Sequence, residues 1–258
     1  MMLELKHVGK TYPHTVKRTL KDINLTIEEG EFICIVGPSG CGKTTLLNLV
    51  AGLEEPTKGE IFLDGVPVKG PGADRVVMFQ EAALYPWLNV MDNVMLGMEF
   101  LGIPKEERKS RALKYLKMVH LSQFTEYPIH QLSGGMRQRV ALARALSMDS
   151  KILLMDEPFS ALDKQTTNML RGELEQIWMK DHSKTILFVT HSAEEAVYFA
   201  DRIVVLSENP GQIKEIIPCD LKRPRQIDDE AFVHLRHMLL ESVKKEVVKF
   251  AREEYDEA

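Results

Sequence analysis

The sequence predicts an α/β fold with a mainly parallel sheet, an antiparallel β subdomain and an inserted helical subdomain. In the C-terminal part, short apolar segments alternate with amphipathic helical segments, which is the pattern of a parallel sheet. The N-terminal part reads as strands joined by tight turns, and residues 86–150 read as helices without a convincing strand. We therefore expect a core at 1–85 and 151–225, a helical subdomain at 86–150 and a C-terminal helix at 226–258.

The composition excludes several classes of protein. The 258 residues are 44% hydrophobic, so the chain can bury a sizeable core, and its formal charge of −5 argues against a general nucleic-acid binder. Because there is no apolar signal core and no apolar run near the roughly 20 residues of a bilayer span, we expect a soluble, cytoplasmic chain. Cys34, Cys41 and Cys219 are odd in number and lack metal-ligand spacing, so we expect neither disulfides nor a structural metal.

The elements follow from local patterns. Strands are predicted at residues 3–8, 20–27, 31–36, 61–63, 75–79, 151–155, 185–189 and 202–206. Asp64-Gly65 is a hairpin turn. Helices are predicted at 44–51, 140–146, 164–179, 193–199 and about 229–254, and within the helical insertion Leu113, Leu116, Val119 and Leu121 have amphipathic spacing. The last helix places an apolar stripe on one side, formed by Phe232, Leu235, Leu239, Val243 and Val247, and packing onto the body of the protein is the favoured interpretation over a partner surface.

A glycine-rich loop follows the strand at 31–36 and precedes the helix at 44–51. It fits the pattern G-x-x-x-x-G-K-[ST] and consists of Gly37, Pro38, Ser39, Gly40, Cys41, Gly42, Lys43, Thr44 and Thr45. Such a loop turns successive backbone N–H groups inward to form an anion nest at a helix N-terminus. Lys43 would reach the β- and γ-phosphates, and the Thr44 hydroxyl would bind Mg²⁺. A glycine turn that only caps a buried helix is the alternative, but the strand and helix on either side favour nucleotide binding.

Cys41 lies within this loop. Lys43 and the helix N-terminus both favour the thiolate, so we expect Cys41 to be a reactive thiol that bound nucleotide protects.

Three further features could serve a nucleotide. Asp156 and Glu157 end an apolar strand, where one carboxylate can bind Mg²⁺ and its neighbour can meet the attacking water. Ser133 with two glycines, Gly134 and Gly135, precedes a helix and forms a second anion site, although a simple N-cap is the alternative. His191 ends another apolar strand, where a histidine taken alone is more often structural than catalytic.

The segments GPSGCGKTT, LSGGMRQR and ILLMDEP and the strand end at His191, in this order, form a highly specific set. The chain resembles the ATPase subunit of an ATP-binding-cassette (ABC) transporter from about Leu3 to Ile217, with a P-loop NTPase core. The resemblance implies ATP and Mg²⁺ as cofactors, with Mg²⁺ bound by Thr44, Gln80 and Asp156.

The resemblance also assigns roles in catalysis. Glu157 resembles the catalytic carboxylate, Gln80 the glutamine that senses Mg²⁺ and the attacking water, and His191 the switch histidine at the γ-phosphate. Tyr12 resembles the aromatic residue that stacks on adenine, although an exposed loop tyrosine is the simpler interpretation. The segment that ends at Asp163 is similar to the loop that crosses to the partner subunit.

In this family two ATPase subunits associate head to tail, so we expect a second copy of the chain or a homologous subunit as partner. Integral membrane permease subunits and a separate solute-binding protein are also implied, with the ATPase peripheral on the inner face of the cell membrane. The segment FQEAALYPWL resembles the nitrate, taurine and aliphatic-sulfonate importers, although Tyr85 replaces an expected apolar residue. The transported solute stays open.

Two other functions fit the sequence less well. A soluble ABC-type ATPase acting on nucleic acid or ribosomes would usually carry two cassettes or a long coiled-coil insertion, and this chain has neither and a negative charge balance. A small-molecule kinase would leave LSGGMRQR without a role.

Overall fold

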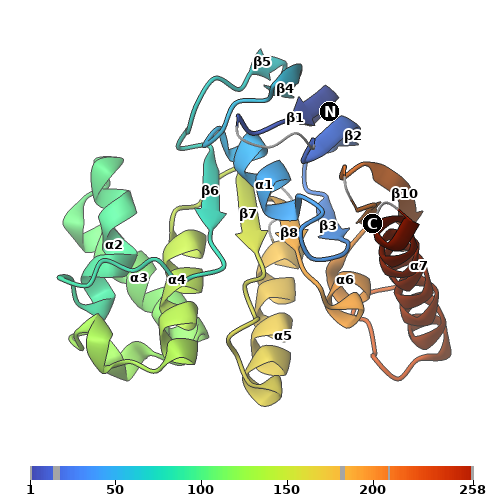
Figure 1. The fold of residues 1–258 in the computed structure, drawn as a ribbon. Coiled ribbons are helices and arrows are strands. Elements are labelled where there is room, and N and C mark those ends of the chain that lie inside the picture. Colours follow the sequence, from blue (N-terminus) through green and yellow to red (C-terminus); the bar gives the residue numbers. More distant parts are fainter. Residues whose placement is uncertain (1, 14–17, 181–183, 209, 257–258) are drawn as a thin grey trace. The chain divides into compact units, whose positions relative to one another are not determined.

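The computed structural model describes residues 2–13, 18–180, 184–208 and 210–256, with side chains of the last helix described as far as Glu246. The chain forms two compact units. The first unit consists of residues 1–71 and 185–258, and the second of residues 72–184 (Figure 1).

The first unit contains the predicted antiparallel β subdomain. Its sheet has the strand order β2-β1-β4-β5, formed by β1 (Leu3–Lys10), β2 (Leu20–Ile27), β4 (Lys58–Leu63) and β5 (Val66–Pro67). Asp64 and Gly65 connect β4 to β5 with φ values of 48° and 75°, as a two-residue hairpin turn with two positive φ angles requires. The pairing of β1 with β2 shifts register between Leu5 and Val8, where His7 also has a positive φ.

A parallel sheet forms the core of the first unit. β3 (Phe32–Val36) lies between β8 (Thr185–Val189) and β9 (Arg202–Leu206) and is parallel to both. Every residue of β3 and β8 is buried, which explains why these strands read as continuous apolar runs. β10 (Ile213–Pro218) pairs antiparallel with β9. The sequence analysis missed β10, whose residues alternate between half-buried and exposed at the edge of the sheet.

Three helices belong to the first unit. They are α1 (Lys43–Ala51), α6 (Ala193–Phe199) and α7 (Glu230–Asp256), and Figure 1 shows α7 beside β10 and α6. Ion pairs join α7 to these neighbours, at 3.5 Å from Arg236 to Glu194 and 3.0 Å from Lys214 to Glu246. Of the predicted stripe, Phe232 and Leu239 are buried, Leu235 and Val243 are half-buried, and the side chain of Val247 lies outside the described residues.

The second unit contains the helical insertion. It has the parallel pair β6 (Arg75–Met78) and β7 (Ile152–Asp156), the helices α2 (Val90–Phe100), α3 (Lys105–Met118), α4 (Gly134–Ser147) and α5 (Lys164–Lys180), and two short 3-10 turns, η1 (Ser122–Phe124) and η2 (Ile129–Gln131). Leu116, Val119 and Leu121 are fully buried as predicted. Leu113, which shares the amphipathic spacing, is 38% exposed and lies at the margin of this buried face.

A buried arginine closes the C-terminal end of α6. Arg225 is 5% exposed, and its guanidinium donates to the carbonyls of Val197, Ala200 and Cys219 at 2.7 Å each. A cation is favoured where the last carbonyls of a helix have no partner within the helix. Arg225 therefore ties the segment that leads into α7 to the end of α6.

We expect Arg225→Met to lower the free energy of unfolding by about 1–3 kcal/mol, because it leaves buried carbonyls without donors. Urea denaturation of parent and variant measures the difference. Arg236→Met, which removes only a partly exposed ion pair with Glu194, is the control and should cost less. Equal stability of the Arg225→Met variant and the parent would contradict this role.

Candidate nucleotide site

The loop after β3 has the geometry of a phosphate cradle. Gly40 and Gly42 adopt φ values of 82° and 96°, which side chains rarely allow. At Gly37 an added Cβ would lie 2.8 Å from the Leu206 carbonyl oxygen and 2.9 Å from the Cys41 sulfur. The glycines of the motif are thus required by backbone conformation at two positions and by close packing at the third.

Lys43 occupies the centre of the loop. It is 8% exposed, and its ammonium donates to the carbonyls of Gly37 at 2.9 Å and Pro38 at 2.7 Å. The first turn of α1 contains no acidic residue, so the positive end of the helix dipole is not neutralised there, and Ser39, Gly40 and Thr44 are exposed. The loop therefore presents an accessible, positively polarised seat for an anion.

The expectation of a reactive Cys41 was wrong. Its side chain is completely buried, and burial raises the pKa of the Cys41 thiol, an effect that outweighs the opposing influence of Lys43. The turn before β10 contributes to this burial, since a side chain on Gly211 would collide with the Cys41 carbonyl oxygen. Sequence reasoning identified the neighbouring charge and missed the desolvation.

Tyr12 is anchored to the helix that follows the cradle. Its hydroxyl donates to Glu54 at 2.9 Å and lies 3.3 Å from the Thr45 hydroxyl. The ammonium of Lys10 lies 5.1 Å from the centre of the ring. Tyr12 is thus not a freely moving loop tyrosine, because its ring is fixed close to the start of α1.

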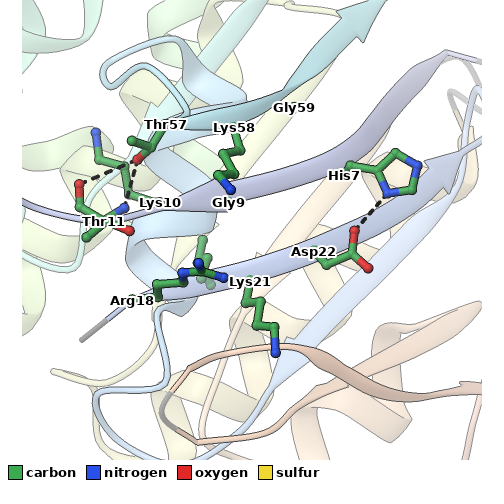
Figure 2. Close-up of a pocket in the computed structure, with 11 residues that line it drawn as sticks. His7, Gly9, Lys10, Thr11, Arg18, Lys21, Asp22, Thr57, Lys58 and Gly59 are labelled. Carbon is green, nitrogen blue, oxygen red and sulfur yellow. Dashed lines mark hydrogen bonds and ion pairs between the residues drawn. The ribbon is translucent and has the colours of Figure 1, made fainter. Parts of the chain in front are cut away.

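A hollow of about 400 Å³ opens beside Lys10 and Thr11 over β1 (Figure 2). Its wall includes three cationic side chains, Arg18, Lys21 and Lys58, together with the carboxylate of Asp22. None of its lining residues belongs to the phosphate cradle. The cations outnumber the acidic groups in this wall, so the hollow is suited to an anionic group.

His191 emerges at the same sheet edge as the cradle. β3 and β8 are parallel, with Ile35 opposite Val189, so both chains leave the sheet at their carboxyl ends. Next to His191, buried Thr190 donates to Glu195 at 2.6 Å, and Ser192 caps α6. The exposed imidazole therefore projects from a segment that is fixed on both sides.

In the second unit, Gln80 and Glu157 come together. Asp156 ends β7 and is buried, and Glu157 follows with φ 46°, a strained conformation for a residue with a side chain. The amide of Gln80 donates to the Glu157 carboxylate over 3.4 Å. Strained backbone of this kind is common at functional sites.

The second predicted anion seat begins α4. Ser133 is its N-cap and accepts from the Met136 N–H at 3.2 Å, and the first turn contains no acidic residue. A Cβ on Gly135 would lie 3.4 Å from Leu162, so the loop that ends at Asp163 lies against this seat. Asp163 itself accepts hydrogen bonds from Thr166, which lower the pKa of its carboxyl group.

The predicted site residues thus fall into two groups. Tyr12, the cradle and His191 belong to the first unit, and the other predicted residues belong to the second. Sequence reasoning missed the supporting residues Glu54, Gly211 and Glu195. For Glu195 a signal was available, because Ser192 and Glu195 have the spacing of a capping box.

A family model described as "ABC transporter" matches residues 20–160, more than half of the 258 residues. The chain belongs to the ABC transporter family. An uncharacterised ABC transporter ATP-binding protein of Methanocaldococcus jannaschii is 54% identical over 249 residues, covering 96% of this chain and 93% of that protein. A taurine import ATP-binding protein of Pseudomonas putida is 45% identical over 250 residues, covering 94% of this chain and 95% of that protein.

A solved ABC structure has the same fold. It is a dimeric post-hydrolysis state of an ATP-binding cassette with bound ADP and Pi, with a TM-score of 0.77 and 36% identity, and the match covers 86% of this chain and all of that one. The predicted fold class is confirmed, and the chain is an ATPase of the ABC family. Among the described residues, none of the helices has the length and apolar character that a membrane crossing requires.

We expect Cys41 to react slowly with iodoacetamide at neutral pH. Because its pKa is raised, the thiolate fraction is small near pH 7, and the rate should climb as the pH rises toward the alkaline range. The measurement uses a Cys34→Ala, Cys219→Ala protein, with the same chain unfolded in guanidinium as the control. Labelling of the folded protein as fast as the unfolded control at pH 7 would show that Cys41 is accessible as thiolate.

Proposed function

We propose that this chain hydrolyses ATP within a head-to-tail pair of ATPase subunits and thereby drives import of a small sulfonate-like solute. The observation that carries the proposal is the presence of two helix N-termini, at Lys43 and at Gly134, neither with an acidic residue in its first turn. One chain has two seats for anionic groups, as expected when each ATP is enclosed by the cradle of one subunit and Ser133, Gly134 and Gly135 of the other.

The residues present fit the nucleotide. The cradle is lined by glycines whose replacement would fill it, and buried Lys43 supplies a positive charge at its centre. Tyr12 offers a fixed aromatic ring for the adenine. We assign Thr44, Gln80 and Asp156 to Mg²⁺, because all three carry the oxygen ligands that this ion prefers. The ion would neutralise charge that develops on the phosphate oxygens.

Three side chains, Glu157, Gln80 and His191, take part in hydrolysis. Glu157 accepts a hydrogen bond from Gln80, so the pair can orient a water molecule and take up its proton. His191 leaves the sheet at the edge where the cradle lies, and its imidazole can donate to the γ-phosphate. Asp163 lies at the N-terminus of α5 in a loop against Gly135, which suits a residue that meets the partner subunit beside the second seat.

Two exposed aromatic side chains suit a membrane permease as the next partner. Trp87 is 76% exposed and Phe100 is 80% exposed, both in the helical part of the second unit. Aromatic side chains with this exposure leave apolar area in water that a partner could cover. We infer that permease subunits cover them, that a separate solute-binding protein acts through the permease, and that the ATPase lies on the inner face of the cell membrane.

The solute class rests on relatives. Proteins named as taurine import ATP-binding proteins are 44–50% identical to the chain, and that name describes the energising subunit of an importer. We therefore favour a taurine-like sulfonate over nitrate, and a transporter over the ATPase that acts on nucleic acid.

Glu157→Gln keeps the shape of the side chain and removes its charge. We expect the variant to bind ATP, to hydrolyse it about 10²-fold more slowly or worse, and to accumulate as an ATP-dependent dimer. Light scattering with and without ATP measures the mass. Adding Ser133→Arg, which fills the second seat with bulk and charge, should abolish the dimer and leave ATP binding intact. A monomeric Glu157→Gln protein at saturating ATP would contradict the head-to-tail pair.

The solute assignment is tested in the source organism. Disruption of the gene for this chain should prevent growth on taurine as the only sulfur source and leave growth on sulfate unchanged. A plasmid copy of the gene should restore growth, whereas a Lys43→Ala copy should not. Normal growth of the disrupted strain on taurine would exclude taurine as the main solute.

A further inference from the structure

Arg144, in the last turn of α4, bonds to the loop that follows Gln80. Its guanidinium donates to the carbonyl of Ala82 at 3.0 Å and to that of Ala83 at 2.9 Å. The same group lies 5.8 Å from the centre of the Tyr85 ring, within cation–π range. One side chain of the helix that begins at Ser133 therefore contacts three of the four residues at 82–85.

The other side of this loop is fixed by α2. Fully buried Asn93 accepts from the Tyr85 N–H at 2.8 Å and donates to the Tyr85 and Leu88 carbonyls at 3.1 and 3.3 Å. Between the two anchors, Ala83 has a φ of 43°, a conformation that residues with a side chain adopt only when their surroundings impose it. Arg144 and Asn93 therefore bond to the loop from two sides and stabilise this backbone conformation.

The contacts of Arg144 are unusual for its charge. Burial lowers the pKa of its guanidinium, and no carboxylate pairs with it among the residues that the structure describes. Its charge is instead satisfied by two backbone carbonyls and an aromatic face. All three contacts go to one short segment, so they fix the guanidinium and residues 82–85 relative to each other.

Gln80 depends on this loop for its place. It follows the end of β6, its side chain is exposed, and its bond to Glu157 is long at 3.4 Å and hence weak. The backbone on both sides must therefore position it: β6 before it and the anchored segment 82–85 after it. The ring of Tyr85 contributes to this anchoring, because an aliphatic residue at the same position would offer Arg144 no aromatic face.

We propose that Arg144 is a positioning residue for hydrolysis, which fixes the segment 82–85 on α4 and thereby sets Gln80 against Glu157. This inference rests on the proposed roles of Gln80 and Glu157. Its chemistry is specific to arginine, whose planar fork reaches two carbonyls at once, whereas a lysine at the same position reaches one.

The first experiment compares Arg144→Lys with Arg111→Lys, a matched change on α3 of the same unit. Single-turnover hydrolysis is followed at saturating ATP over a range of Mg²⁺ concentrations. We expect Arg144→Lys to keep its thermal midpoint and its ATP affinity, to lose about 10-fold or more in rate, and to need more Mg²⁺, as for residues that orient metal ligands. Arg111→Lys should match the parent. A parental rate and Mg²⁺ dependence in Arg144→Lys would overturn the proposal.

A second measurement keeps the test independent of turnover. In a Trp178→Phe background, Trp87 is the only tryptophan, and it reports on the loop through its ring contact with Tyr85 at 5.5 Å. Its fluorescence anisotropy should fall in Arg144→Lys and in Tyr85→Leu and should stay near the parent value in Tyr85→Phe, which retains the ring. Unchanged anisotropy in both Arg144→Lys and Tyr85→Leu would show that Arg144 does not hold this loop.

A double variant separates this inference from the proposed function. If Arg144 acts through Gln80, Gln80→Ala with Arg144→Lys should be no slower than Gln80→Ala alone, because the two changes act on one group. Additive losses would overturn the positioning role. If instead Gln80→Ala alone hydrolyses ATP normally, the role assigned to Gln80 fails, and the anisotropy still tells whether Arg144 fixes the loop.

Discussion

The bonds from the Lys43 ammonium to the carbonyls of Gly37 and Pro38 are the interaction on which the candidate site depends. They pull the loop around a buried positive charge, and the positive φ angles of Gly40 and Gly42 let the backbone follow. The same curvature requires close packing against Leu206 and Gly211. The cradle is therefore built by the ends of β3 and β9 and the turn after β9, and not by the motif alone.

Other site residues could be predicted because they follow the ends of parallel strands, which meet at one edge of a sheet. His191 follows β8 beside the cradle strand β3, and in the second unit Asp156 ends β7 beside β6, which precedes Gln80. Burial on both faces makes these strands continuously apolar, so their ends are sharply marked in the sequence. Two further site residues, Ser133 and Asp163, lie at helix N-termini. Each accepts a hydrogen bond from a backbone N–H group in the first turn of its helix.

Sequence reasoning succeeded where the signal is local and failed where it depends on packing. The strands at β8 and β9 and helix α6 were predicted to the residue, because turns and apolar runs bound them closely. β10 was missed because an edge strand with charged and proline positions has little apolar pattern. Leu113 and Cys41 show that burial could not be predicted from local sequence. Leu113 is apolar but lies partly at the surface, whereas Cys41 lies in a polar loop but is completely buried. The contacts of Arg144 with a loop 61 residues away in sequence could not be inferred from spacing at all.

The burial of all three thiols also bears on the tolerance of the enzyme to oxidants. Cys34, Cys41 and Cys219 are free and buried, and burial raises the pKa of each. Peroxide attacks the thiolate, and access to the sulfur limits its rate. A cysteine within a phosphate cradle would ordinarily be a point of oxidative inactivation. Here Gly37 packs closely against the Cys41 sulfur, so we expect the cradle to resist peroxide.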